Sequence, residues 1–134
     1  MIAKEVAERL AAVARRKTVR LTHYGRKSGN PYQVTIWFMV DGEKVYLSTM
    51  DMKRQWTQNV QNRPEIELDI GGERFRGKVE EVVSSDAEMS RVVDLMKRKY
   101  ILSRPYFWFK PHPAGAFRVK IEPEAPGGAD SAAK

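Results

Sequence analysis

Hydrophobic residues follow two different periods along this chain. Ile2, Val6 and Leu10 recur at helical spacing, whereas the stretch "RFRGKVEEVV" (74–83) alternates between apolar and polar residues, as half-buried strands do. This pattern predicts three helices and six strands. We expect the helices at residues 2–15, 52–62 and 86–100, and the strands at 17–24, 32–40, 45–49, 65–70, 74–83 and 116–122.

Turn and cap signals separate these segments. Asp41-Gly42 suits a tight hairpin turn, Pro64 ends the second helix, and Ser85 with Glu88 forms a capping-box pattern before the third. Hairpins join most of the strands, and short antiparallel strands that close on themselves leave few exposed edges. The sequence therefore predicts a mainly β (α+β) fold, a small antiparallel barrel with peripheral helices.

The length suits one domain. We expect a single domain over residues 1–122, because 134 residues can form a core without disulfides or metals and no internal repeat or second domain is visible. Residues 123–134 have no apolar periodicity and are predicted to be a disordered tail.

Composition narrows the classes of function. The chain has no cysteine and only two histidines, so no metal site is predicted. No apolar run approaches the roughly 20 residues of a membrane span, and no signal peptide is visible, so a cytoplasmic location is expected. The net charge of +7 favours an anionic partner: nucleic acid, anionic lipid or a phosphorylated small molecule.

The loop "THYGRKSGNP" (22–31), between the first two strands, carries a dense set of polar groups. Glycines at both ends let a turn present backbone N–H groups in a concave nest. Arg26 offers a planar bidentate donor, Lys27 a point charge and Ser28 a hydroxyl, which together suit a phosphate. The same residues suit a solvated hairpin turn, and the loop alone favours that interpretation because short basic turns are common.

A second segment changes this balance. Lys53 and Arg54 stand at the start of a predicted helix, where the helix dipole disfavours cations unless an anion binds there. Because two separate segments each suit a phosphate, a shared anion site is more plausible than it would be from one segment alone. On the same helix, Trp56 is better explained as a core anchor than as a stacking platform, and Asn59 lies about one turn further on.

Aromatic residues offer a further set of candidates. Trp37 and Phe38 point to opposite faces of their strand, so one is expected in the core and the other needs a cover. The stretch "RPYFWF" (104–109) is interpreted as a hydrophobic lid, a dimer contact or a segment facing the substrate, with Tyr106 as the candidate side chain. No catalytic triad or paired carboxylates are recognisable.

Taken together, "LTHYGRKSGNPYQVTIWFMVDGEKVYLST" (21–49), the later Lys53–Trp56–Asn59 pattern and "NRP" (62–64) resemble the deazaflavin-dependent nitroreductase family. That family belongs to the flavin/deazaflavin oxidoreductase superfamily of split β-barrels, which is related to pyridoxamine-phosphate oxidases. The resemblance covers roughly residues 15–122. It implies a six-stranded antiparallel split β-barrel, with an N-terminal helix and two inserted helices, that binds coenzyme F-420 or FMN in a groove.

The resemblance also assigns residues to the cofactor. By position, Arg26, Lys27, Ser28, Gly29 and Lys53 would bind its phosphate, Gln33, Val34, Thr35 and Ile36 would run beside its rings through backbone groups, Trp56 and Asn59 would complete the site, and Trp37 and Tyr106 would face the substrate. Tyr32 stands where many deazaflavin-binding members have arginine. The choice between F-420 and FMN therefore stays open.

Three functions follow from these features. The favoured one is an oxidoreductase that transfers hydride between the cofactor and a small electron-poor molecule such as a quinone, nitroaromatic or enone. The alternative is a non-catalytic split barrel that binds a flavin, haem or lipid. A binder of single-stranded nucleic acid is the least favoured, because the aromatics gather in one loop rather than along a basic groove. A homodimer is expected from the resemblance.

Overall fold

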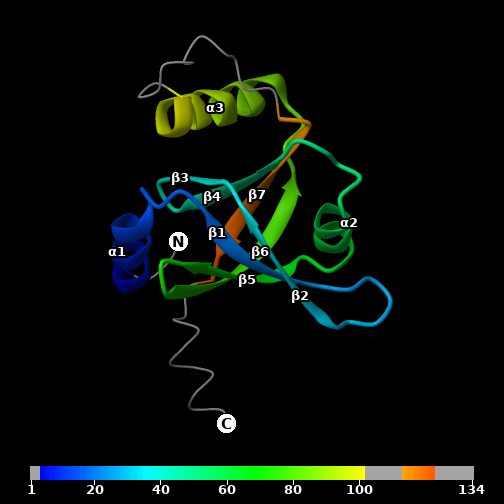
Figure 1. Cartoon of the computed structure of the whole chain (residues 1–134). Coiled ribbons are helices and arrows are strands. Elements are labelled where there is room, and N and C mark those ends of the chain that lie inside the picture. Colours follow the sequence, from blue (N-terminus) through cyan, green and yellow to red (C-terminus); the bar gives the residue numbers. More distant parts are fainter. Residues whose placement is uncertain (1–3, 102–112, 123–134) are drawn as a thin grey trace.

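A computed structural model describes residues 4–101 and 113–122 of the chain. Its strands form one antiparallel sheet in the order β2–β1–β5–β6–β7–β4–β3, which curls strongly on itself (Figure 1). The elements are α1 (Lys4–Val13), β1 (Val19–Tyr24), β2 (Pro31–Ile36), β3 (Phe38–Asp41), β4 (Lys44–Thr49), α2 (Gln55–Asn62), β5 (Glu65–Ile70), β6 (Glu73–Val82), α3 (Asp86–Met96), the π-helical turn η1 (Lys97–Ile101) and β7 (Gly115–Ile121).

The fold class predicted from the sequence is confirmed, with one difference in the strands. The segment predicted as a single strand over 32–40 is divided into β2 and β3 at Trp37, which raises the number of described strands from the expected six to seven. Beyond the break, the Phe38 N–H donates to the Tyr100 hydroxyl at 3.2 Å, and its carbonyl accepts from Lys99 Nζ at 2.8 Å. Side chains from η1 therefore satisfy backbone groups of Phe38.

The sheet carries a core on each of its faces. Inside the curl, Phe38, Phe75 and Phe117 are fully buried together with the apolar face of α1. On the outer face, Met39 and Tyr46 pack under α3. Because neighbouring residues on a strand point to opposite faces, adjacent Phe38 and Met39 supply one core each.

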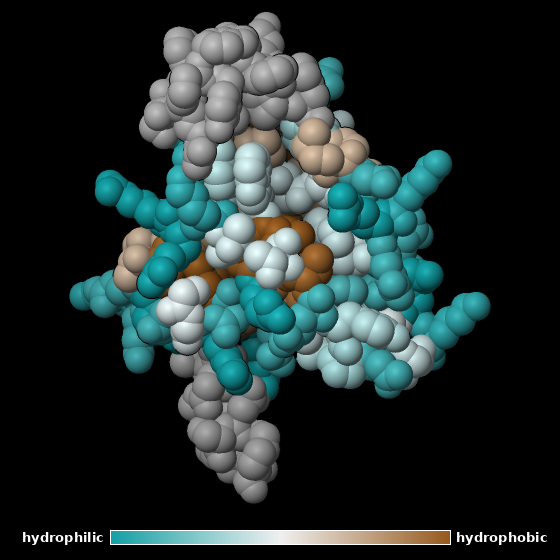
Figure 2. All heavy atoms as spheres, in the orientation of Figure 1, coloured by the Kyte–Doolittle hydropathy of each residue, from teal (hydrophilic) through white to brown (hydrophobic). Residues whose placement is uncertain are grey.

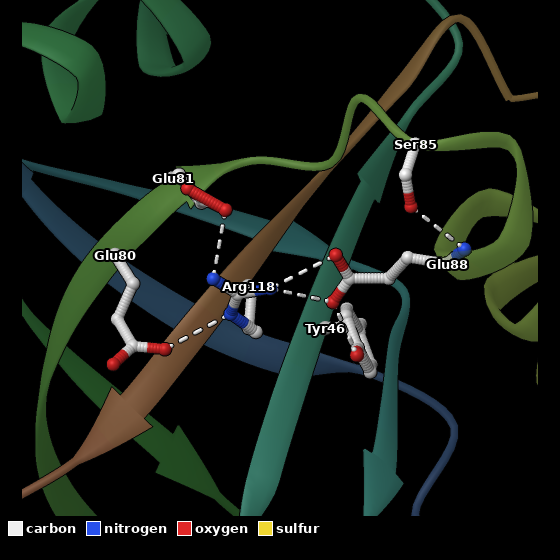
Figure 3. A network of polar contacts seen from close by, with 6 residues as sticks. All are labelled: Tyr46, Glu80, Glu81, Ser85, Glu88 and Arg118. Carbon is white, nitrogen blue, oxygen red and sulfur yellow. Dashed lines mark hydrogen bonds and ion pairs between the residues drawn. The ribbon is translucent and has the colours of Figure 1, made fainter.

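Helix α3 is attached to the sheet by a network around Arg118 of β7 (Figure 3). Arg118 Nη1 lies 2.9 Å from both carboxylate oxygens of Glu88, and the Tyr46 hydroxyl donates to Glu88 at 2.7 Å. The same guanidinium forms ion pairs with Glu80 at 3.0 Å and Glu81 at 2.9 Å. The hydrogen bond from Tyr46 and the charge of Arg118 lower the pKa of Glu88, so this carboxylate is ionised at neutral pH.

The expected capping box at the start of α3 forms only in part. Ser85 accepts a hydrogen bond from the Glu88 N–H at 3.0 Å, as an N-cap does. The Glu88 side chain instead turns to Arg118 and Tyr46. An ion pair with a part-buried arginine thus replaces the reciprocal bond of the box.

Two sequence-based predictions fall outside the described part of the chain. These are the disordered tail at 123–134 and the aromatic stretch that contains Tyr106. Among the helices of the described residues, none has the length and apolar character needed to cross a bilayer.

Candidate functional site

The loop between β1 and β2 is a closed turn with its cations on the outside. The Gly25 N–H donates to the Asn30 carbonyl at 2.9 Å, and the Gly29 N–H donates to the Gly25 carbonyl at 3.0 Å. Gly29 has a φ of 75°, a left-handed conformation that favours glycine. Arg26 and Lys27 are exposed at the tip of the hairpin. These two amides are used within the loop, so an anion here would be bound mainly by side chains.

Ser28 can have two roles in this turn. Its Oγ accepts a hydrogen bond from the Asn30 N–H at 3.0 Å, which fixes the side chain against the loop. A hydroxyl that accepts one bond still has its proton to donate. Ser28 can therefore donate to an anion beside Arg26 while it stabilises the turn.

Arg26 is tied to helix α2 through a buried amide. Its Nη1 donates to Asn59 Oδ1 at 2.9 Å, and Asn59 Nδ2 lies 3.0 Å from Nδ1 of His23. Asn59 is 1% exposed and His23 is 4% exposed. A buried polar chain of this kind orients the exposed guanidinium at its end, because a free arginine side chain samples many rotamers.

The protonation of His23 suits this arrangement. Burial lowers the pKa of His23 from its ordinary value, which keeps the ring neutral at pH 7. A neutral imidazole has one acceptor nitrogen, and the contact with Asn59 Nδ2 assigns that role to Nδ1. The Asn59 oxygen is then directed to Arg26.

Arg63 is a third cation at the loop and was not among the residues predicted for the site. Its guanidinium carbon and terminal nitrogens lie 3.7–3.8 Å from the point where a side chain at Gly29 would begin. Asn59 and Arg63 are four residues apart at the end of α2, so both face the hairpin. Among the described residues, no carboxylate forms an ion pair with Arg26, Lys27 or Arg63.

The C-terminal end of helix α2, rather than its N-terminus, lies next to the loop. Arg54 is the N-cap of α2 and has no side-chain cap, and the Lys53 N–H donates to Asp51 Oδ1 at 2.9 Å. Arg54 and Arg63 are separated by about 13 Å along the helix axis, at 1.5 Å per residue. Both Lys53 and Arg54 are exposed, and in the described residues neither hydrogen-bonds to the loop.

Trp56 is a core residue. It is 4% exposed and packs edge-on against Phe117, with ring centroids 5.5 Å apart. This is the anchor role that the sequence analysis favoured over ligand stacking. It fixes α2 against the sheet and so fixes the helix that holds Asn59 and Arg63.

Strand β2 leaves one edge of the sheet open beside the loop. Within the described chain it pairs only with β1. Val34 and Ile36 are half-buried against the core, whereas Gln33 and Thr35 are exposed and accept hydrogen bonds from Arg20 at 3.1 and 3.4 Å. A ligand along this edge would therefore meet backbone groups and two polar side chains. Figure 2 shows apolar atoms at the centre of the face viewed, framed by hydrophilic side chains.

Trp37 marks the far end of β2. It is 44% exposed and stacks on Tyr100, with ring centroids 4.0 Å apart and an interplanar angle of 5°. Phe38 is fully buried, which confirms that one of these two aromatic residues enters the core. That the exposed part of Trp37 is covered stays a prediction.

Comparison with known proteins now identifies the family. The family described as pyridoxamine 5′-phosphate oxidase matches residues 3–124, almost the whole chain. The chain belongs to this family. The relationship to pyridoxamine-phosphate oxidases that the resemblance implied is thereby confirmed, whereas no curated protein matches the chain with significance.

Solved structures are also similar to the chain in fold. An F420 reductase shares 21% identity over 84% of this chain and 91% of its own, with a TM-score of 0.62. An F420-H2 dependent reductase shares 18% identity over 78% of this chain and 95% of its own, with a TM-score of 0.58. An FMN-binding protein from Syntrophomonas wolfei subsp. wolfei shares 10% identity over 88% and 86%, with a TM-score of 0.62. At these identities the comparison establishes the fold that the family members share.

Proposed function

We propose that the protein is an oxidoreductase that binds coenzyme F-420 or FMN with the phosphate on the β1–β2 loop. The observation that carries the proposal is the geometry of Arg26, which is exposed at the tip of the hairpin while its guanidinium donates a hydrogen bond to the buried Asn59. Lys27 and Arg63 add two cations without ion-pair partners in the described chain, and Ser28 adds a hydroxyl donor. Membership of the family and the cofactors named for the F420 reductases and the FMN-binding protein support the same choice.

Each candidate residue has a role in this proposal. Arg26, Lys27, Ser28 and Arg63 bind the phosphate, Gly29 supplies the left-handed φ of 75° that the turn requires, and Lys53 extends the positive surface from the start of α2. The backbone of Gln33–Ile36 runs beside the rings, and Trp37 lies on the substrate side. Asn59 and Trp56 act from the buried side, by holding Arg26 and α2 in place. Tyr106 remains a candidate on the substrate side from the sequence alone.

The bound cofactor would supply hydride transfer to a small electron-poor acceptor such as a quinone, nitroaromatic or enone. The protein would orient the cofactor and provide a flat aromatic contact at Trp37. A cytoplasmic location is proposed on the sequence alone.

The proposal is tested by titration of the purified protein with FMN, reduced F-420 and riboflavin, which is FMN without its phosphate. A phosphate site predicts that FMN binds at least about tenfold more tightly than riboflavin, because each hydrogen bond between charged groups contributes about 1.5–3 kcal/mol. Failure of both FMN and F-420 to bind at micromolar concentrations would contradict the cofactor assignment. Oxidation of the bound reduced cofactor by a naphthoquinone under anaerobic conditions then distinguishes an enzyme from a binding protein.

The protein is also proposed to form a homodimer. Trp37 is 44% exposed and Met50 is 68% exposed, and the open edge of β2 lies beside an apolar area of the surface (Figure 2). Edge strands and large apolar side chains are usually covered in stable proteins. Light scattering should give about 31 kDa, twice the 15.4 kDa of one chain. Trp37→Lys should shift the mass towards a monomer with unchanged circular dichroism, whereas a monomeric wild type would refute the dimer.

A further inference from the structure

A cavity lies on the other side of the molecule from the β1–β2 loop. Its volume is about 450 Å³, within the range of roughly 300–1,000 Å³ typical of small-molecule sites. We call it the basic cavity, and its lining residues are Ala14, Arg15, Met39, Val40, Leu95, Arg98 and Lys99. These residues come from the segment after α1, from β3, and from α3 with η1. Figure 1 shows these elements well separated from the tip of the β1–β2 hairpin.

The wall of the basic cavity has an excess of positive charge. Arg15, Arg98 and Lys99 line it, and Lys17 is near enough to act on Lys99 electrostatically. Of these four cations, only Arg98 has an ion-pair partner in the described chain, Asp94 at 3.0 Å, and Asp94 also lies 3.8 Å from Arg91. Among the described residues, Asp94 is therefore the one carboxylate that forms an ion pair with any of these four cations, and it is shared with Arg91.

Lys99 is fixed in place at this wall. Its Nζ donates to the Phe38 carbonyl at 2.8 Å and lies 3.5 Å from the centroid of the Phe38 ring. Burial and, secondarily, the charge of Lys17 lower the pKa of Lys99 to about 8. An ammonium that is held rigidly, partly desolvated and close to a like charge gains stability when an anion binds beside it.

The rest of the lining is apolar. Met39 lies behind this wall and is almost fully buried, whereas Val40 and Leu95 are half-buried, so these two residues offer hydrocarbon surface next to the cations. A fully hydrated inorganic anion would leave this surface exposed to water, and a neutral apolar molecule would leave the cations unpaired. The complementary ligand carries both an acid group and an apolar body.

We propose that the basic cavity binds a small amphiphilic carboxylate, with the acid group on Lys99 and Arg15 and the hydrocarbon part on Val40 and Leu95. This site is independent of the proposed cofactor site, because it shares no residue with the β1–β2 loop or with strand β2. Lys99 serves as the partly buried charge of the site, and Arg15 serves as the exposed one.

Calorimetric titration with decanoate tests the proposal, with decanol as the uncharged probe of equal length. Decanoate should bind at one site per chain, and both Lys99→Met and Arg15→Met should weaken it by about tenfold or more, the expected loss of one charged hydrogen bond. Arg15 has no hydrogen bond or ion pair with a described residue to lose, so Arg15→Met tests the site even where Lys99→Met perturbs the fold near Phe38. Lys27→Met removes a charge at the hairpin and should leave decanoate binding unchanged.

The pH dependence gives a second test that a nonspecific apolar surface would not reproduce. The ammonium of Lys99 binds the carboxylate and faces Lys17, Arg15 and Arg98, with Asp94 beyond Arg98. Because its pKa is about 8, the affinity for decanoate should be full near pH 7 and should fall as the pH rises to 9.5. Arg15→Met should keep this fall, and Lys99→Met should remove it.

Several outcomes would overturn the site. These are equal affinities for decanol and decanoate, equal affinities in wild type and both variants, or no saturable binding. Binding to phosphatidylglycerol vesicles without binding of decanoate would also overturn it, and would indicate a membrane surface instead. Failure of FMN and F-420 to bind would contradict the proposed function and leave the basic cavity unaffected, since the decanoate titration requires no cofactor.

Discussion

Replacing Arg26 and Lys27 together with alanine is expected to weaken the binding of FMN or F-420 by at least about a hundredfold. The reason is the number of charged contacts, since each contributes about 1.5–3 kcal/mol and each 1.4 kcal/mol corresponds to a factor of ten. Arg26 has further importance because its guanidinium is already oriented by Asn59 at 2.9 Å. Less rotamer entropy is then lost when the phosphate binds.

The measurement is a fluorescence titration at fixed ionic strength, because the net charge of the chain also attracts a phosphate. Lys44→Ala with Lys120→Ala is the matched control. It removes the same charge from two exposed residues that face each other on β4 and β7, away from the hairpin tip. Riboflavin should bind the Arg26/Lys27 variant and the wild type equally. An FMN affinity that stays within a factor of two in this variant would remove the loop from the cofactor site.

The local part of the fold could be predicted from the sequence. Period-two alternation in β6 and helical spacing in α1 and α3 depend on neighbouring residues only, and each element appears within a few residues of its expected bounds. Gly71-Gly72 likewise joins β5 to β6, with positive φ at both glycines. Short stretches of sequence determine these features, so the local pattern of residues is enough to predict them.

The break at Trp37 could not be predicted in this way. The residues of 32–40 suit a continuous strand, and the Phe38 N–H and carbonyl are satisfied by η1, 61–62 residues further along the chain. The end of α3 shows the same limit, because a helix predicted to run to residue 100 gives way to a π-helical turn from which Tyr100 reaches Phe38. Contacts between distant elements decide both features.

Several residues of the candidate site could be predicted from the sequence, but the hydrogen bonds that join them could not. Arg26 was expected at the phosphate and Asn59 elsewhere in the cofactor site, yet they are 33 residues apart and meet only because α2 packs across the end of β1. His23 was not among the residues predicted for the site. Its place on the same strand face as Val19 and Leu21 was the available signal that it is buried. Arg63 belongs to the "NRP" stretch (62–64) of the resemblance, but nothing in the sequence assigned it a role in the site.

Asn59→Ala is expected to weaken FMN binding by about two- to tenfold, although Asn59 is 1% exposed and touches no ligand in this proposal. Without Asn59 the guanidinium of Arg26 is free to move, and fixing it on phosphate binding costs about 0.5–1.5 kcal/mol of the binding free energy. The buried hydrogen bond between Asn59 and His23 is also lost. The expected cost to the free energy of unfolding is about 1–3 kcal/mol, as for a buried group left unsatisfied. A urea titration measures this cost separately from affinity.

A double-mutant cycle between Asn59→Ala and Arg26→Ala decides whether Asn59 acts through Arg26. Residues joined in one hydrogen-bond chain are not additive, so Asn59→Ala should have little further effect on FMN affinity once Arg26 is alanine. Riboflavin supplies the second comparison, because a positioning role predicts that only the phosphate-bearing ligand loses affinity. Additive losses, or equal losses for riboflavin and FMN, would mean that Asn59 matters only for the stability of α2. If Asn59→Ala has no further effect once Arg26 is alanine, the buried Asn59–His23 pair belongs to the phosphate site, where it holds the Arg26 guanidinium in the orientation that binds the ligand.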